Sequence, residues 1–352
     1  MTPGVHQVLA GAAPRDAITN HALIAQGVIR GMGLRSEVFV DSSHLSRELV
    51  DQVVPHERWD DLTTDADRVI VHYSIDSTAF DHVIARAART GLHYHNITPP
   101  DLLWRDAPHI AWSCLRGRRQ LAELAGRIDL SAADSQFNAA EIDDLGFPPA
   151  AVIGILRTPV AAIARSPRRG PRARLLFVGR GAPNKCQHDA VLAMGALRDR
   201  GVDAELRLVG SWGSNAAYLY RCLRLAEECG VRDRVHVLGS LSDADMASEF
   251  AHADLFLCLS EHEGFGVPLV QAMEYGLPVV AFAAGAVPET LGDAGLLLHD
   301  KRPSMVAEAT AEVLGGTLAA RMANGRANQL TQHSHHSTAQ RVRRFVTDLT
   351  AC

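Results

Sequence analysis

The residues best suited to chemistry lie in the segment 260–280. Glu261 and Glu263 precede a short loop in which two glycines flank an aromatic residue, and Pro268 fits the first turn of a following helix. A glycine loop that enters a helix presents free N–H groups and the positive end of the helix dipole to an anion. Two carboxylates beside such a loop repel an anion unless they face a neutral polyol. The segment therefore indicates a sugar nucleotide as the ligand.

A second candidate for anion binding lies in the loop that follows residue 179. Arg180 and Lys185 place two cations in this loop. Lysine is rare in the chain, with Lys185 and Lys301 as its two examples, so a lysine in a candidate site indicates a need for a compact ammonium group. Two cations in one loop can neutralise phosphates.

Strands and helices alternate through the second half of the chain. Short apolar strands separated by helices of about ten to fifteen residues predict βαβ units and a parallel sheet with helices on both faces. Ligands of such sheets bind at the carboxyl ends of the strands, where residues 179, 210, 239 and 260 are expected. The expected strands are 173–180, 204–211, 234–241 and 254–260, and the expected helices are 187–201, 216–230 and 243–253.

The first half shows the same pattern less regularly, and the fold class that we expect is α/β with two Rossmann-like domains. We expect a first domain over 1–158, a linker rich in Pro, Gly and Arg over 159–172, and a second domain over 173–336. The tail has the pattern of an amphipathic helix at 337–352, which we expect to pack back on the first domain. The candidate strands of the first half are 6–11, 36–40, 67–74, 91–96 and 129–135, and its helices are near 19–33, 78–90 and 113–126.

Composition excludes several classes of protein. The 352 residues allow two domains of ordinary size, and the 47% hydrophobic content argues against disorder. A net charge of −5 gives no general basic surface for nucleic acid. We see neither a signal-peptide pattern nor an apolar run long enough for a bilayer, and the six scattered cysteines without a CxxC pair fit a reducing compartment. We therefore expect a cytoplasmic protein.

Three ordered segments of the second half resemble one family of enzymes. They are FVGRGAPNKCQHDAVLAM, VLGSLSDADMASEFAHADLFLCLSEHEGFGVPLVQAMEYGLPVVA and GAVPETLGDAGLLL. Through them the chain resembles the GT-B glycosyltransferases, and among these the family 4 of retaining, nucleotide-sugar-dependent enzymes (glycosyl transferases group 1). IVHYS, HYHNITP and DLSAADSQFNAAEIDDLGF resemble the acceptor-side domain of a bacterial subgroup. The resemblance implies parallel sheets that face an interdomain cleft, no cofactor, no metal, and a nucleoside diphosphate sugar as co-substrate.

The resemblance also implies roles for residues of the second half. Arg180 and Lys185 match the pair that binds the donor pyrophosphate, and Glu263 matches the first glutamate of a Glu-x7-Glu motif, which faces the sugar hydroxyls. The second glutamate, which normally holds the ribose, is Gln271 here. Glutamine keeps a ribose contact but loses charge-assisted hydrogen bonds, which are roughly twice as strong as neutral ones. The implied donor-binding residues are Gly179, Arg180, Lys185, Gly210, Leu241, Glu263, Gly264, Phe265, Gly266 and Gln271.

In the first half the resemblance singles out two histidines. His95 matches a histidine near the transferring sugar, where it orients or polarises substrate hydroxyls, and His72 is expected to line the same cleft. His93 shares a sheet face with His95 by the two-residue period of a strand, but we see no tetrahedral set of metal ligands. Polar residues replace a Gly-Gly of the family before the first helix, where they either cap that helix or bind acceptor hydroxyls. The implied acceptor-binding residues are Asp16, Thr19, Asn20, His72 and His95.

These observations predict a retaining, metal-independent hexosyltransferase that moves a sugar to a hydroxyl on a glycan, a lipid-linked carrier or a small molecule. Its catalytic residues would be His95, Glu263, Arg180 and Lys185. Two alternatives stay open: a nucleotide-sugar epimerase of the same fold, and a catalytically weak sugar-nucleotide-binding protein, which Gln271 favours. The acceptor, the donor base and sugar, and the oligomeric state also stay open. Peripheral membrane contact is a further alternative, through Trp104, Trp112, Arg116, Arg118 and Arg119.

Overall fold

A computed structural model describes residues 3–158, 170–213 and 215–351, with the side chains of 319 and 320 excepted. Its contacts divide the chain into two compact units. The first unit comprises Met1–Pro99, Trp112–Pro159 and Gln332–Cys352, and the second unit comprises Pro100–Ala111 and Val160–Thr331. The segment Pro100–Ala111, which the sequence assigned to the first domain, groups with the second unit. Most of the expected linker lies outside the described residues.

The first unit contains a seven-stranded sheet in which all neighbouring strands are parallel. Its strand order is β3-β2-β1-β4-β5-β6-β7. The central strands β1, β4 and β5 are buried along almost their whole length, because a strand with helices on both faces needs apolar residues on both. The bounds are β1 Val5–Leu9, β2 Val38–Val40, β3 Val54–Pro55, β4 Arg68–Tyr73, β5 Arg89–Tyr94, β6 Leu130–Ala133 and β7 Ala150–Val152.

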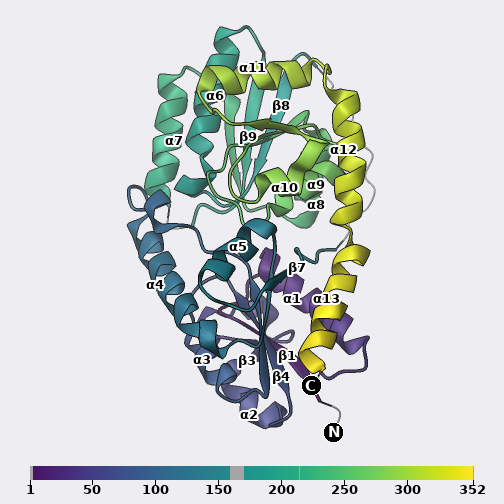
Figure 1. Ribbon diagram of the computed structural model, residues 1–352. Coiled ribbons are helices and arrows are strands. Elements are labelled where there is room, and N and C mark those ends of the chain that lie inside the picture. The colour runs from purple at the N-terminus through teal and green to yellow at the C-terminus, as the bar shows by residue number, and fades with distance from the viewer. Residues whose placement is uncertain (1–2, 159–169, 214, 352) are drawn as a thin grey trace. The chain divides into compact units, whose positions relative to one another are not determined.

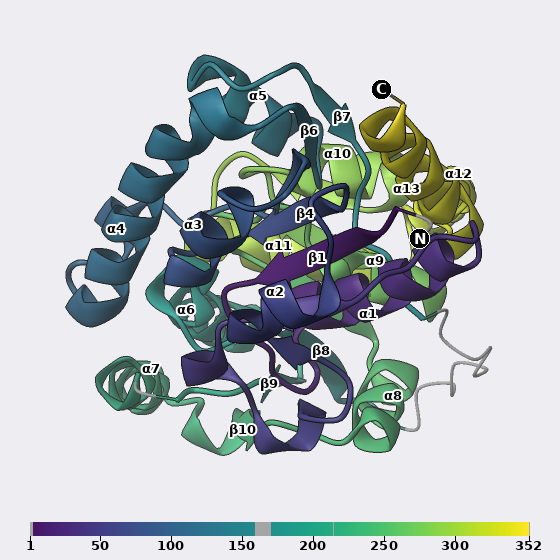
Figure 2. The same ribbon diagram turned by 90° about the horizontal axis from the view of Figure 1, so that it is seen from below.

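Helices cover both faces of this first sheet. Figure 2 shows α1 (Ala17–Arg30) on one side of β1 and β4, and α3 (Thr78–Ile84) on the other. The C-terminal helix α13 (His335–Thr350) lies beside α1 and buries Phe345 and Leu349 in the same core as residues of β1 and α1. The last helix of the chain therefore completes the first unit.

The second unit contains a six-stranded parallel sheet of order β10-β9-β8-β11-β12-β13. Helices α6 (Gln187–Asp199) and α11 (Pro303–Leu314) pack against each other and bury Met194 and Val306 in the core that the sheet shares (Figure 1). The strand bounds are β8 Ala173–Val178, β9 Ala204–Val209, β10 Val235–Gly239, β11 Leu255–Cys258, β12 Val279–Phe282 and β13 Leu296–Leu298.

The predicted alternation of parallel strands and helices is confirmed in both units. The short edge strands β3 and β7 were not predicted, because they are too short to show an apolar period. The strand β13 and the helices α2, α5, α10, α11 and α12 were not predicted either. The remaining helices are α2 Trp59–Leu62, α4 Pro108–Leu124, α5 Gln136–Asp144, α7 Ala216–Glu228, α8 Asp243–His252, α9 Val267–Glu274, α10 Val287–Leu291 and α12 Ala319–Gln332.

Candidate active site

The glycine loop joins β11 to α9 in the second unit. Gly266 adopts a left-handed backbone with φ 89° and directly precedes α9, so the helix begins at Val267, one residue before the expected Pro268. Phe265 is buried, and its carbonyl accepts a hydrogen bond of 2.6 Å from the Thr290 hydroxyl. The loop is therefore fixed by packing and by a buried hydrogen bond, and it leaves the first N–H groups of α9 without a side-chain cap.

The turn between β12 and α10 contacts the start of the glycine loop and helps to fix its backbone. The Ala286 N–H donates to the Glu263 carbonyl at 2.9 Å. Gly285 has φ 56°, and a Cβ on it would lie 2.5 Å from the same carbonyl oxygen. Glycine is required here both by the backbone conformation and by the close approach. The backbone of Glu263 is thus held by a neighbouring loop whose geometry tolerates no side chain.

Lys185 and Glu263 form an ion pair with an Nζ–Oε2 distance of 2.6 Å. Lys185 ends the short 3-10 turn Pro183–Lys185, and the two side chains are 20% and 13% exposed. The Glu261 N–H donates to the Asn184 carbonyl at 2.8 Å, which joins the same two loops through their backbones. A cation suited to phosphate and a carboxylate suited to hydroxyl groups are therefore held together, 78 residues apart in the chain.

Two further loops, after β9 and β10, meet the loop of Lys185 at the same carboxyl edge of the second sheet. Gly210 has φ 138°, and a Cβ on it would lie 2.1 Å from the Gly179 carbonyl oxygen, so the loops after β8 and β9 touch. The Gly210 N–H donates to the Gly239 carbonyl at 2.8 Å, which adds the loop after β10, two residues before Leu241. The Arg180 side chain is exposed beside them, and its carbonyl accepts from the Gln187 amide at 2.9 Å.

Gln271 lies on α9, within the first turns after the glycine loop. Its side chain is partly buried, and within the described residues its amide makes no hydrogen bond. The Gln271 amide therefore does not stabilise the fold through a hydrogen bond. It stands on the helix whose N-terminus carries the glycine loop.

The second lysine of the chain contacts Glu261, the other glutamate before the glycine loop. Lys301 Nζ lies 2.5 Å from Glu261 Oε1, 2.8 Å from Asp189 Oδ2 and 3.3 Å from Cys186 Sγ. Burial lowers the pKa of Lys301, but the hydrogen bonds that its ammonium donates to Asp189 and Glu261 outweigh burial and raise that pKa above its usual value. Cys186, His188 and Asp189 could together offer metal ligands, but the Lys301 ammonium already serves as the cation there.

The two histidines predicted in the first half lie together at the carboxyl ends of β4 and β5. His72 Nδ1 and His95 Nε2 are 2.8 Å apart, and both side chains are buried. His95 Nδ1 lies 3.0 Å from both carboxylate oxygens of Asp134, and His72 Nε2 lies 2.8 Å from Gln7 Oε1. Both ring nitrogens of His95 are therefore engaged within the first unit. Sequence reasoning missed Gln7 and Asp134, although Asp134 lies at the end of the predicted strand 129–135.

Two more histidines complete this cluster. His93 lies on the same face of β5 as His95, with ring centroids 4.2 Å apart, and His21 reaches it from α1, with its ring centroid 4.8 Å from that of His93. Burial lowers the pKa of His93 to about 4 and holds the pKa of His72 well below its usual value, so both rings are neutral near pH 7. We refer to His21, His72, His93, His95 and Asp134 as the histidine cluster.

The polar residues before the first helix act as its cap. Asp16 is the N-cap of α1 and accepts hydrogen bonds of 2.8 Å from both the backbone N–H and the hydroxyl of Thr19. The Thr19 hydroxyl in turn accepts from the Ala13 N–H at 3.3 Å. Asn20 is exposed on the following turn. Asp16 and Thr19 thus stabilise the helix start, whatever else they bind.

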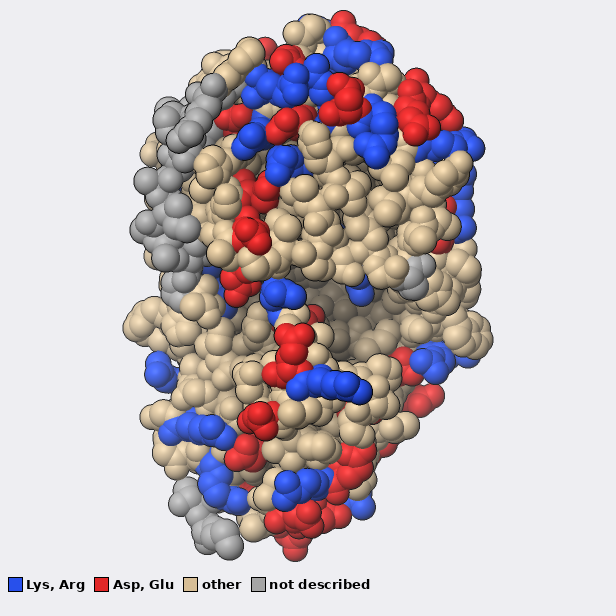
Figure 3. Space-filling model, turned by 180° about the vertical axis from the view of Figure 1, so that it is seen from behind, with Lys and Arg blue, Asp and Glu red and all other residues tan. Residues whose placement is uncertain are grey.

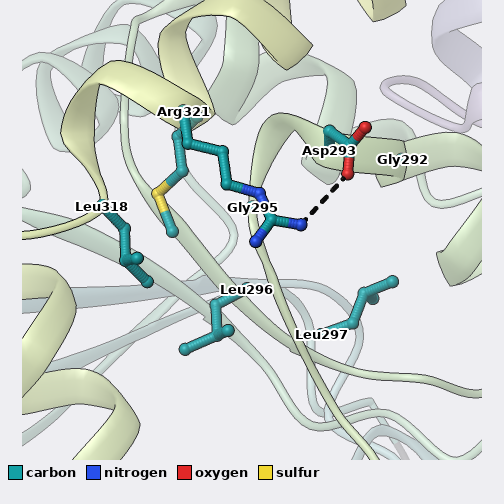
Figure 4. A pocket seen from close by; sticks show the side chains of 8 residues that line it. Gly292, Asp293, Gly295, Leu296, Leu297, Leu318 and Arg321 are labelled. Atoms are coloured by element: carbon teal, nitrogen blue, oxygen red, sulfur yellow. Dashed lines mark hydrogen bonds and ion pairs between the residues drawn. The ribbon is translucent and has the colours of Figure 1, made fainter.

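The pocket in Figure 4 is not a candidate for the reaction. It lies beside the start of β13, and the Arg321 guanidinium pairs with Asp293 at 3.4 Å at its rim. A second pocket, lined by 201–204 and 230–234, lies before β9 and β10. Both are at the amino edge of the second sheet, whereas ligands of parallel sheets bind at the carboxyl edge.

The surface features considered for membrane contact are partly neutralised. Trp112 is 53% exposed, but Arg116 pairs with Asp76 at 3.2 Å and Arg118 pairs with Glu141 at 2.5 Å. Basic and acidic side chains are interspersed over the face shown in Figure 3. Within the described residues, no helix is long and apolar enough to cross a bilayer.

Residues 161–329 match the sequence pattern of the family described as Glycosyl transferases group 1. The chain carries a group 1 glycosyl transferase domain. This domain contains the candidate site of the second unit, from the loop after β8 to the glycine loop and α9.

Characterised relatives of the group 1 domain are glycosyltransferases. One is a GDP-mannose-dependent α-(1-6)-phosphatidylinositol monomannoside mannosyltransferase of Mycobacterium tuberculosis, 31% identical over 163 residues, which are 44% of this chain and 41% of that protein. Another is a D-inositol 3-phosphate glycosyltransferase of Salinispora arenicola, 28% identical over 349 residues, which are 92% of this chain and 74% of that protein. The chain thus spans less than half of the length of the mannosyltransferase that it matches.

Solved structures with the same fold include one in complex with a nucleotide and a sugar. Anabaena Alr3699/HepE in complex with UDP and glucose superposes with a TM-score of 0.77 over 98% of this chain and 100% of that chain, at 17% identity. Sucrose-phosphate synthase (tll1590) from Thermosynechococcus elongatus gives a TM-score of 0.78 over 99% of both chains, at 17% identity. The expected GT-B fold, with two Rossmann-like parallel sheets, is confirmed.

Proposed function

We propose that the protein is a retaining glycosyltransferase that moves a sugar from a nucleoside diphosphate sugar to a hydroxyl acceptor. The observation that carries this proposal is the 2.6 Å pair of Lys185 and Glu263 at the entrance of the glycine loop. It sets a phosphate-binding cation beside a hydroxyl-binding carboxylate at the carboxyl edge of a parallel sheet. The match to the group 1 family and the nucleotide-sugar dependence of a relative support the same function.

Different loops of the second unit would bind different parts of the donor. Lys185 and Arg180 would neutralise the pyrophosphate and the charge that grows on the leaving nucleoside diphosphate, so that no metal ion is needed. The first N–H groups of α9, after Gly266, would add the positive end of a helix dipole. Glu263 would bind the sugar hydroxyls and Gln271 the ribose. The ion pair of Lys185 and Glu263 would then break when the donor binds, as Lys185 contacts the pyrophosphate and Glu263 contacts the sugar hydroxyls.

The donor and acceptor probes follow from the relatives. GDP-mannose is the donor of one relative, and UDP-glucose is bound in a structure of the same fold, so both are tested. Inositol phosphate is a reasonable first acceptor because a relative that covers most of the chain is named for it. Retention at the anomeric carbon is read from the product by its coupling constant in NMR.

The decisive experiment measures release of nucleoside diphosphate and formation of a glycosylated product with each donor, with and without acceptor. Lys185→Met and Glu263→Gln should each lower kcat/KM by about 100-fold, the usual cost of one preorganised electrostatic contact. The control is Arg224→Met, which removes an exposed cation paired with Glu228 on α7. Wild-type protein that turns over neither donor, or variants that match Arg224→Met, would contradict the proposal.

A second candidate is a sugar-nucleotide-binding protein with little catalytic power. Gln271 favours it, because the ribose position lacks the glutamate of the motif. Calorimetry with the same donors separates the two functions. Tight binding without nucleotide release supports the binding protein, and conversion of the donor sugar without release supports an epimerase.

A further inference from the structure

The histidine cluster of the first unit surrounds one buried carboxylate with imidazole nitrogens. Its one carboxylate, Asp134, is 3% exposed and contacts histidines: His93 Nε2 at 2.9 Å and His95 Nδ1 at 3.0 Å. Within the described residues, no lysine or arginine pairs with this carboxylate. The cluster around Asp189 differs in this respect, because the Lys301 ammonium fills it.

The hydrogen-bond chain through the cluster fixes which atoms carry protons. The Gln7 amide donates to the Ala22 carbonyl at 3.0 Å, so Gln7 turns its oxygen to His72 and accepts from His72 Nε2 at 2.8 Å. The neutral His72 ring then accepts at Nδ1 from His95 Nε2, at 2.8 Å. This leaves His95 Nδ1 aimed at the Asp134 carboxylate, where either a proton or a metal ion joins the two. Two lone pairs 3.0 Å apart repel each other unless a cation lies between them.

His93 supplies a third atom without a partner. Its Nε2 is buried 2.9 Å from Asp134 Oδ1, but the geometry of the contact is not that of a hydrogen bond. A proton on His95 Nδ1 would bridge His95 and Asp134 and would still leave His93 Nε2 unpaired. A metal ion accepts all three atoms at once. His93 and His95 alternate on one face of β5, an arrangement that directs both rings to the same side.

We infer that His93 Nε2, His95 Nδ1 and Asp134 form a binding site for a Zn²⁺-class divalent ion in the first unit. Two imidazoles and a carboxylate are ligands that Zn²⁺ takes, with a fourth position for water. Tetrahedral ligands about 2.0–2.1 Å from zinc stand ~3.3 Å apart, a few tenths of an ångström wider than the present contacts. The inference is independent of the proposed function, whose donor chemistry lies in the second unit.

The surroundings of these three atoms suit a metal ion. A ligating histidine commonly donates its other N–H to a fixed acceptor, and here His95 donates to His72, which donates to Gln7. His21 is not a ligand, because its Nδ1 accepts from the Leu156 N–H at 2.8 Å and its Nε2 must carry the proton of the neutral ring. The ion would join β5 to the end of β6.

The test is titration of chelator-treated protein with Co²⁺, read by its visible ligand-field absorption, followed by displacement with Zn²⁺ and elemental analysis. Wild-type protein should bind one equivalent. His93→Gln and Asp134→Asn should each weaken binding at least 100-fold, and His72→Gln about 10- to 100-fold, because it removes the acceptor that orients His95.

The control is His82→Gln, which removes a histidine of the same unit whose Nε2 is also buried without a partner, away from Asp134. It should leave the binding unchanged. Cooperative thermal melting verifies that each variant is folded. If Asp134→Asn does not fold, the metal affinity of His93→Gln tests the site. Wild-type protein that takes up no stoichiometric Co²⁺ or Zn²⁺ at micromolar concentration would overturn the inference. So would equal binding by His93→Gln, or an NMR spectrum in the presence of Zn²⁺ with both His95 nitrogens protonated.

Discussion

At the scale of single residues, the candidate donor site is built from ion pairs between its own members. The two lysines of the chain pair with the two glutamates that precede the glycine loop: Lys185 with Glu263 and Lys301 with Glu261. The first pair can exchange its partners for a donor, because each member suits a different part of a sugar nucleotide. The second pair has further contacts with Asp189 and Cys186, so it acts as a fixed support.

Lys301→Met should destabilise the second unit by about 1–3 kcal/mol, because it leaves the partly buried Asp189 carboxylate, and the exposed Glu261 beside it, without their donor. Urea unfolding followed by circular dichroism measures the change. The matched control is Arg200→Met, which breaks an exposed pair with Glu308 and should cost less than 1 kcal/mol. Equal effects of the two substitutions would show that the Lys301 contacts carry no special stability.

Gln271→Glu should lower the KM for the nucleotide donor roughly fivefold, since a charge-assisted hydrogen bond to the ribose adds about 1 kcal/mol over a neutral one. The amide makes no hydrogen bond inside the described structure, so its replacement breaks no internal hydrogen bond. Steady-state kinetics at saturating acceptor measure the effect, and Gln52→Glu, an exposed site in the first unit, controls for added charge. An unchanged or higher KM would remove Gln271 from the ribose site.

At the scale of elements, the loops of the second unit fix the backbone of the site more firmly than its side chains. The loop after β12 contacts the Glu263 carbonyl, and the loops after β8 and β9 touch through Gly179 and Gly210. Close contact between backbones requires glycine and leaves little room to adjust. A substitution in a supporting loop should therefore alter the reaction without removing any group that binds substrate.

Gly285→Ala tests this support. Its Cβ would meet the Glu263 carbonyl at 2.5 Å, so the variant should displace Glu263 and lower kcat/KM about tenfold or more, beyond the ~1–2 kcal/mol cost of the left-handed backbone. Gly33→Ala is the control, because Gly33 has φ 79° and open space around it. It should show the backbone cost in urea unfolding and no loss of activity. Similar kinetics in the two variants would refute a supporting role for the turn.

Much of the order of strands and helices could be predicted from the sequence, because it depends on the spacing of apolar residues within short segments. The central strands and the glycine loop carry apolar runs and turn residues in sequence order. The edge strands β3 and β7 are too short to show a period. The pairing of Lys301 with Glu261 and the approach of His21 on α1 to His93 on β5 depend on tertiary packing, which no local pattern encodes.

At the scale of the whole molecule, buried titratable groups in both units link stability to pH. Burial lowers the pKa of His6 and His82 in the first unit and of His188 in the second. For His6, the effect of burial outweighs the opposite effect of the nearby Asp67 carboxylate. Burial raises the pKa of Asp67, but hydrogen bonds from the Gly4 and Thr64 N–H groups and the charge of His6 outweigh it and hold that pKa below its usual value. Both classes of group favour the folded state at neutral pH.

The resulting prediction is a loss of stability in two pH windows. The pKa of these histidines is lower in the folded state than the value of about 6.5 in the unfolded chain. Below pH 6.5 the unfolded chain therefore binds more protons than the folded protein, and the free energy of unfolding falls as the pH falls. Each such group contributes up to about 1.4 kcal/mol per pH unit. Below the unfolded aspartate pKa of about 3.9, the contribution of Asp67 is lost as well, because protonation of the unfolded carboxyl favours unfolding.

Urea midpoints between pH 7.5 and 3 should therefore fall first below pH 6.5 and again below pH 4. His6→Gln should flatten the first fall for the first unit, because it removes a group that titrates differently in the two states, and Asp67→Asn should flatten the second. His336→Gln, at an exposed position of α13, is the control for histidine removal. A His6→Gln protein with the same slope as His336→Gln between pH 6.5 and 5 would show that His6 is charged in the folded state, and that its pairing with Asp67 outweighs its burial.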